Sequence, residues 1–445
     1  MHGSITLNIR YFILSMNAIT NDFSYHFVMK RFLYTALFLL VCFTAQSQTP
    51  IEHRILNKDI RSVSIYPIDQ PLSMPIVPMN GVLEISFDDL GEYIRELEYT
   101  IIHCKRDWTP SNLNISEYLD GFDDASLRDF NSSRGSILDY MHYDLRLPND
   151  DIKWRISGNY ILKVWDRDND NELLMTLRFV VYETNVQFTQ GEVFESGRLG
   201  SFDTHESLTY ALRIKDIGLD APMRSISSSV FQNQNWHSMI DSINPRRVHS
   251  GELYFDQRNS VIFPAMRQYR LTDLRSLSSP GYGVASVEEY TDGINVTKTT
   301  DEVRGFEVGF GRDDDLNGAF VIDNTERLND LWGVQYAYTL FTLHYFNAPP
   351  DADIYLLGAF NQYQVDEHSK MELNEPESIF YKEVLLKQGV YDYVYGVKRP
   401  NEPISFQETE GYDNRAQNDY HVIIYYHPFL GTYDRVIAYA TMSAR

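Results

Sequence analysis

Carboxylates are the side chains in this sequence whose spacing most resembles a chemical site. Asp166, Asp168, Asp170 and Glu172 alternate along the chain, like the first ligands of an EF-hand calcium loop. Such a loop requires glycine at its sixth position, where Asn171 stands, and a bidentate glutamate at its twelfth, which this sequence lacks. We therefore interpret the cluster as a solvated hairpin turn and predict no metal site.

Two further groupings could do chemistry but have simpler interpretations. Tyr391, Tyr393 and Tyr395 alternate, so they share one face of a strand and form either a sugar-stacking platform or, more commonly, part of a core. His103 precedes Cys104, but nothing nearby in the sequence would activate a thiol. We predict buried strand positions for both of these residues.

Motifs of the common enzyme classes are absent from the sequence. It contains no GxSxG, HExxH or P-loop motif, no Cys–His metal spacing, and no βαβ pattern that could hold a dinucleotide. We therefore predict a protein that is not an enzyme and has no cofactor. A hydrolase stays open as an alternative, because the carboxylates of glycosidases carry no local motif.

Charge excludes two classes of partner. The 445 residues include 39 Lys+Arg and 62 Asp+Glu, which gives a formal charge of −23. Nucleic-acid binding and docking on anionic lipid both require the opposite sign, so we predict neither. The uncharged stretch 331–350 contains Gln335, His344 and Asn347, which are costly in hydrocarbon, and its alternation predicts a half-buried strand. We predict no direct insertion into a membrane.

The elements that position these residues are predicted to be strands. Helical periodicity is scarce, and alternating runs rich in Tyr, Val, Ile and Phe are separated by turn residues. The clearest runs are residues 97–104, 159–165, 173–182, 389–397 and 419–426. The pattern predicts an all-β protein of three consecutive immunoglobulin-like β-sandwiches, over residues 48–185, 186–330 and 331–445.

The N-terminus has the features of an export signal. Lys30 and Arg31 precede the apolar run 32–44, and residues 45–47 (AQS) fit the small-x-small rule for cleavage. Met29 is the expected true start, so residues 1–47 are an upstream extension plus signal peptide. Cleavage leaves 398 residues (445 − 47) with Cys104 as the one cysteine. The mature protein must then be stabilised by burial, without an internal disulfide.

Several long, irregular motifs are distinctive. They occur at residues 103–122 (HCKRDWTPSNLNISEYLDGF), 147–149 (LPN), 157–160 (SGNY), 252–255 (ELYF), 269–277 (YRLTDLRSL), 356–363 (LLGAFNQY) and 408–411 (ETEG). In this arrangement the chain resembles the plug protein family of the type IX secretion system, found in Bacteroidota. The resemblance extends over essentially the whole mature chain.

The resemblance implies a function. Plug-like proteins are periplasmic, bind the periplasmic mouth of the system's giant outer-membrane β-barrel, and block its pore while no substrate is bound. It implies a protein that is associated with the outer membrane through that barrel and is a monomer when free. It supplies no catalytic residue.

The loop that follows residue 104 contains the candidate contact residues. Trp108 and Tyr118, with the neighbouring Asp107, could meet the barrel, because the loop carries large aromatic side chains where polar ones would suffice. The alternative is that the two aromatic side chains fold back and pin the loop to the sandwich.

The last domain also resembles the early-set β-sandwiches of glycogen-active proteins, through residues 353–363 (DIYLLGAFNQY). In those modules a tryptophan at this turn often stacks on sugar. Here Asn361 and Tyr363 occupy the turn, and this departure weakens the case for sugar binding. A periplasmic carbohydrate-binding protein is the alternative function.

Overall fold

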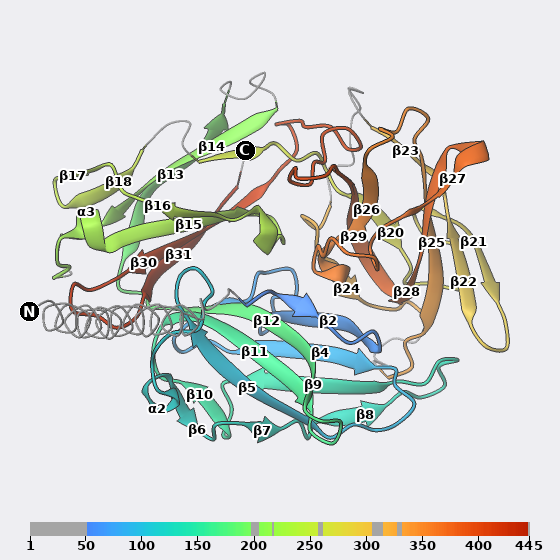
Figure 1. The fold of residues 1–445 in the computed structure, drawn as a ribbon, viewed down its shortest axis with the longest axis horizontal. Helices are drawn as coiled ribbons and strands as arrows, with labels where there is room; N and C mark the ends of the chain where they lie inside the picture. The colour runs from blue at the N-terminus through green and yellow to red at the C-terminus, as the bar shows by residue number, and fades with distance from the viewer. Residues whose placement is uncertain are drawn as a thin grey trace, which may run out of the picture. The chain divides into compact units, whose positions relative to one another are not determined.

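The computed structural model describes residues 51–196, 204–215, 218–256, 261–304, 315–326 and 332–443. Contacts divide the chain into two units, residues 1–49 and 50–445, and the description below concerns the second. The predicted signal peptide, residues 1–47, lies outside the described residues. Across the described ranges, no helix is long and apolar enough to cross a membrane. Strands dominate the structure (Figure 1), which confirms the all-β prediction.

Two sheets pack face to face in the N-terminal part. The first has the order β1-β12-β11-β5-β7 with β3 beside β12, and the second has the order β2-β4-β9-β8. Their bounds are β1 (Arg54–Ile55), β12 (Glu172–Tyr182), β11 (Gly158–Asp166), β5 (Leu97–Cys104), β7 (Ala125–Ser126), β3 (Ile76–Pro78), β2 (Ile60–Pro67), β4 (Leu83–Asp89), β9 (Met141–Leu147) and β8 (Phe130–Ser132). A short helix α2 (Ile115–Tyr118) leads into the pair β6 (Leu119–Gly121) and β10 (Ile152–Trp154).

Strand β11 shows why this sheet is buried on both faces. Tyr160, Leu162 and Val164 point into the core shared with the β2-β4-β9-β8 sheet, whereas Ile161 belongs to a second core on the opposite face. The turn between β11 and β12 places Asn171 at φ 57°, a conformation that asparagine tolerates well. The segment is therefore a hairpin turn, as predicted, but Asp166 ends β11 and is buried, not solvated.

The middle sheets join distant parts of the chain. One has the order β13-β14-β18-β17 with β19 beside β14, and the other has the order β16-β15-β30-β31. Their bounds are β13 (Gln187–Glu195), β14 (His205–Arg213), β18 (Glu252–Phe255), β17 (Arg247–His249), β19 (Ile262–Pro264), β16 (Ile240–Ile243), β15 (Ile226–Gln232), β30 (Asp419–Tyr426) and β31 (Arg435–Ser443). Helix α3 (Pro222–Ser225) precedes β15, and the 3-10 turn η1 (Trp236–Ser238) follows it.

The remaining two sheets enclose the predicted tyrosine stripe. They are β20-β29-β24, with β26 beside β29, and β21-β22-β25-β28-β27, with β23 beside β25. Their bounds are β20 (Arg270–Asp273), β29 (Gly389–Lys398), β24 (Phe320–Ile322), β26 (Asp353–Leu357), β21 (Val284–Glu289), β22 (Ile294–Lys298), β25 (Tyr336–His344), β28 (Ile379–Lys387), β27 (Glu372–Asn374) and β23 (Asp301–Glu302). The 3-10 turns η2 (Ala359–Asn361) and η3 (Glu375–Glu377) lie between these strands. Tyr391, Tyr393 and Tyr395 of β29 are buried in the core between the sheets, and β25 is the strand predicted within 331–350.

Strand pairing crosses the boundary that the sequence predicted between residues 330 and 331. β30 pairs with β15 from Ile226↔Tyr426 to Gln232↔Tyr420, so the C-terminal strands complete a sheet of the middle part. Conversely, β20 and β22 pair with β29 and β25 of the predicted last domain. The sheets of residues 186–445 are therefore not consecutive in the sequence. Alternation predicts that a strand exists but not which distant strand lies beside it.

Candidate interaction surface

Trp108 lies in a core, 3% exposed. Its ring meets Trp236 edge-on, with centroids 5.4 Å apart, and the Arg178 guanidinium lies 4.6 Å above it. The core around it contains side chains from the N-terminal sheet and from the β16-β15-β30-β31 sheet: Met74, Ile76, Cys104, Ile161, Val180, Phe231, Ile423, Tyr425 and Val436. Trp108 therefore holds the loop against two sheets.

Tyr118 and Asp107 have local roles in the same loop. Tyr118 ends α2 and is buried, with its ring centroid 5.8 Å from that of His103. Asp107 is exposed, and its Oδ1 accepts hydrogen bonds from the backbone N–H of Thr109 at 3.0 Å and from its hydroxyl at 2.6 Å. These positions fit the alternative left open by the sequence, in which the aromatic side chains pin the loop. They do not present Trp108 or Tyr118 to a partner.

His103 and Cys104 are both buried strand residues, as predicted. Burial lowers the pKa of His103 to about 4 and raises the pKa of the Cys104 thiol to about 12, so both are neutral at physiological pH. A Cβ on Gly158 would lie 2.2 Å from the His103 Nε2, and glycine is therefore required there. This tight packing leaves no approach for a reactive thiol.

The turn with Asn361 and Tyr363 is closed to sugar. Tyr363 is 4% exposed, has φ 53°, and donates its hydroxyl to the Gly318 carbonyl at 3.2 Å. Asn361 binds its own turn: its Oδ1 accepts from Gly358 N–H, and its amide donates to the Leu356 carbonyl. Neither residue offers a free stacking face.

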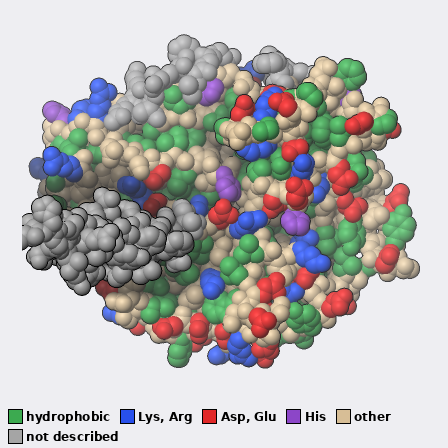
Figure 2. Space-filling model, viewed as in Figure 1, with side chains coloured by type: hydrophobic (Ala, Val, Ile, Leu, Met, Phe, Trp, Pro, Cys, Tyr) green, Lys and Arg blue, Asp and Glu red, His purple; other side chains and the backbone are tan. Residues whose placement is uncertain are grey.

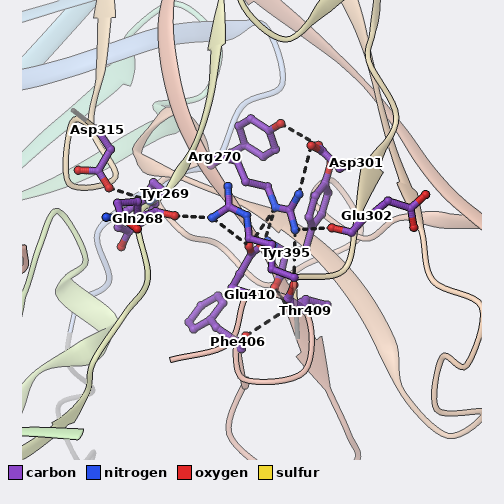
Figure 3. A network of polar contacts seen from close by, with 12 residues as sticks. Gln268, Tyr269, Arg270, Asp301, Glu302, Asp315, Tyr395, Phe406, Thr409 and Glu410 are labelled. Atoms are coloured by element: carbon purple, nitrogen blue, oxygen red, sulfur yellow. Dashed lines mark hydrogen bonds and ion pairs between the residues drawn. The ribbon is translucent and has the colours of Figure 1, made fainter. Parts of the chain in front are cut away.

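A buried ion network holds the segment 405–412 against β20 and β29 (Figure 3). The Arg270 Nε lies 2.9 Å from the Glu410 Oε2, and its Nη1 lies 3.1 Å from the Asp301 Oδ1. The hydroxyl of Tyr395 donates to Asp301 at 2.8 Å, and the backbone N–H of Tyr395 donates to Glu410. Arg270 belongs to the motif at 269–277 and Glu410 to the motif at 408–411.

The network stabilises the fold and is not a reactive site. Burial alone would lower the pKa of Arg270, but Glu410 and Asp301 raise it above its usual value, so the guanidinium stays charged. Burial lowers the pKa of Lys298, beside the Tyr393 ring, to about 8. Arg270 and Glu410 are both buried and bonded to protein groups, so a substrate could not reach them without unfolding this segment.

A second buried network joins the N-terminal sheets to β25 and β28. Asp88 of β4 accepts hydrogen bonds from the Lys387 ammonium at 2.7 Å and from the Tyr336 hydroxyl at 2.6 Å. Its other oxygen lies 2.6 Å from the His142 Nδ1, and the Lys387 ammonium sits 4.1 Å above the Tyr140 ring. Since each charge has a hydrogen-bonded partner at short distance, these contacts offset the desolvation penalty of burying the network.

His142 should make stability depend on pH. Burial would lower the pKa of His142, but its contacts with Asp144 and Asp88 raise it to about 9 from 6.5. Its contribution is therefore fully present below about pH 6.5 and is lost as pH rises through about 9. We expect the difference in unfolding free energy between wild type and His142→Gln to fall by about 3 kcal/mol over that range in urea titrations. A difference that stays constant with pH would contradict this.

The described residues also line cavities. One of about 380 Å³ is lined by His53, His237, Tyr363 and Lys398, among others. Burial lowers the pKa of His53 to about 3, so it is a neutral imidazole whose Nδ1 accepts from the Arg178 backbone N–H at 2.8 Å. Within the described ranges, no three His, Cys, Asp or Glu side chains are grouped to hold a metal ion.

The exposed apolar side chains form the remaining candidate. Phe429 and Leu430, at the tip of the hairpin between β30 and β31, are 89% and 90% exposed, the highest values among the large apolar side chains of the described residues. Elsewhere, acidic and basic side chains are interleaved over the face shown in Figure 2. The sequence interpretation missed this tip, although two adjacent apolar residues between Pro428 and Gly431 were a visible signal.

Comparison with known proteins identifies the N-terminal part. Residues 60–183 match the model for the first domain of the type 9 (type IX) secretion system plug protein. These residues, called the plug domain below, are similar to the first domain of type IX plug proteins. The plug domain spans β2 to β12 and includes Trp108, Tyr118 and His142. The family resemblance inferred from the sequence is thus confirmed over residues 60–183.

Most of the chain is also similar to a solved structure. A crystal structure of a hypothetical protein from Parabacteroides merdae matches with a TM-score of 0.84 and 28% sequence identity, covering 89% of this chain and 100% of that one. Among curated proteins, none matches this chain. The fold of most of this chain therefore recurs in another protein.

Proposed function

We propose that this protein is a periplasmic, non-enzymatic plug subunit of the type IX secretion system. It binds the periplasmic mouth of the giant outer-membrane β-barrel and closes the pore while no substrate is bound. The observation that carries the proposal is the plug domain at residues 60–183. The export signal predicted at residues 1–47 agrees with this location.

The physical character of the chain supports this role. A plug must keep its shape against an open pore, and the Asp88 and Arg270 networks and the Trp108 core tie distant segments together. It must also leave when cargo arrives. An interface of standard size, about 1,600 Å², can hold a partner without extreme affinity.

Carbohydrate binding is not proposed, because Tyr363 is buried and Asn361 is occupied by its own turn. No polymer-stacking surface is therefore available at the turn on which that alternative rested.

Isolation of the native complex tests the proposal. We expect a C-terminally tagged chain, expressed from its own locus, to retain the giant barrel from solubilised outer membranes. Deletion of the gene should raise entry of a large antibiotic that intact outer membranes exclude, and the tagged chain should reverse this. The proposal fails if no barrel is retained and deletion leaves permeability unchanged.

A further inference from the structure

The tip of the β30–β31 hairpin is a turn with defined geometry. The backbone N–H of Gly431 donates to the Pro428 carbonyl at 2.8 Å, so Phe429 and Leu430 occupy the two central positions of a β-turn. Turns at such positions normally carry Gly, Asn, Asp or Ser. The two apolar side chains are neither required by the turn nor buried by the described fold.

The base of the hairpin is held by the plug domain. The Asp434 carboxylate accepts a hydrogen bond from the Arg106 backbone N–H at 3.0 Å, and its other oxygen lies 3.0 Å from the His427 Nδ1. The Tyr433 ring packs edge-on against His103, with centroids 5.5 Å apart. The exposed pair therefore projects from an anchored base, which reduces the entropy lost when a partner binds it.

Two further contacts fix the strands on either side. Arg435 forms an ion pair with Glu183 of the plug domain, with its Nε 2.9 Å from the Glu183 Oε1. The His427 backbone N–H donates to the Ser225 carbonyl at 2.8 Å. Hence a substitution at the tip leaves the anchoring contacts in place.

The chemistry of the tip favours a protein partner over a bilayer. Residues 427–434 (HPFLGTYD) contain no Lys or Arg, and Arg435 is already paired with Glu183, so the hairpin loop itself carries no free basic group to attract anionic headgroups. Phe429 and Leu430 together carry less hydrocarbon than one myristoyl chain, which binds membranes only marginally. An aromatic and an aliphatic side chain at one point are, by contrast, sufficient to anchor a protein interface.

We propose that Phe429 and Leu430 insert into an apolar socket on the protein partner and are the main anchor of this interface. The partner is the barrel of the proposed function, on which this inference rests. The partner's socket should be rimmed by basic or neutral groups, because Asp434 lies at the base of the tip.

The test compares two double variants in the tagged full-length chain. Phe429→Ser/Leu430→Ser alters the tip, and Phe346→Ser/Leu373→Ser is the matched control, because these two exposed apolar side chains line a separate groove of about 700 Å³. We expect the tip variant to weaken binding to the purified barrel by at least about 30-fold, the size of an interface hot spot. The control should bind like wild type, and both variants should keep the wild-type melting temperature.

The other outcomes separate the hypotheses. If wild type binds the barrel and the tip variant binds equally well, the inference is wrong and the proposed function stands. If wild type binds no barrel, both fail. Flotation with phosphatidylethanolamine–phosphatidylglycerol vesicles that is lost in the tip variant would assign the tip to a bilayer and overturn the inference. So would concentration-dependent self-association, measured by sedimentation, that the tip variant lacks.

Discussion

Replacing Arg270 by methionine is expected to lower the unfolding free energy by about 3–5 kcal/mol. The reason is that the change removes the cation that directly contacts Asp301 and Glu410, and leaves the almost completely buried Glu410 with the more distant Arg304, whose Nη1 lies 3.7 Å from it. Methionine fills a similar volume, so the loss measures the uncompensated charge more than a cavity. Urea-induced unfolding, followed by circular dichroism, would measure the difference.

Two comparisons make this prediction specific. Arg146→Met removes a solvent-exposed pair with Glu84, whose atoms are 2.8 Å apart, and should lower the unfolding free energy much less, because solvent screens the pair. Adding Glu410→Gln to Arg270→Met should restore part of the stability, because it removes the buried charge. If Arg270→Met costs no more than Arg146→Met, the network does not stabilise the fold as argued.

Trp108→Ala should have a comparable effect for a different reason. Truncating this buried indole removes its contacts with Trp236 and the Arg178 guanidinium and opens a cavity between two sheets. Large-to-small changes of this kind cost about 3–5 kcal/mol. Thermal and urea unfolding would measure the loss.

The surface residue Phe122 supplies the control for Trp108, since it is exposed and follows β6, a few residues beyond the same loop. Phe122→Ala should change stability by no more than about 0.5 kcal/mol. At temperatures where Trp108→Ala remains folded, its binding to the barrel should equal that of wild type. If Trp108→Ala instead lost binding to the barrel but kept wild-type stability, Trp108 would contact the barrel.

Local features of this fold were predictable from the sequence. The bounds predicted for β5 and β30 agree with the structure, because alternation of apolar and polar residues reflects the two faces of a strand. The burial of Tyr391, Tyr393 and Tyr395 followed from the same pattern, as did the turn before β12.

Long-range features were not predictable. Trp108 is buried by Trp236 and Ile423, which come from elements that follow the plug domain, and no local pattern reveals that contact. Only the three-dimensional contacts of Trp108 show that it is a buried residue of the loop and not an exposed residue that contacts a partner. Phe429 and Leu430 could have been found, since apolar residues at the centre of a turn break the usual preference.

The pairing of β15 with β30 has a consequence for how the protein is made. All seven residues of β15 are buried in the finished fold, yet the strand that covers one of its edges lies almost 200 residues later. Chains are synthesised from the N-terminus. The edge of β15 that pairs with β30 therefore stays unpaired until Asp419–Tyr426 has been made. Such an edge is a template for aggregation. A chain that ends before β30 should therefore be a substrate for chaperones and proteases, even with its plug domain intact.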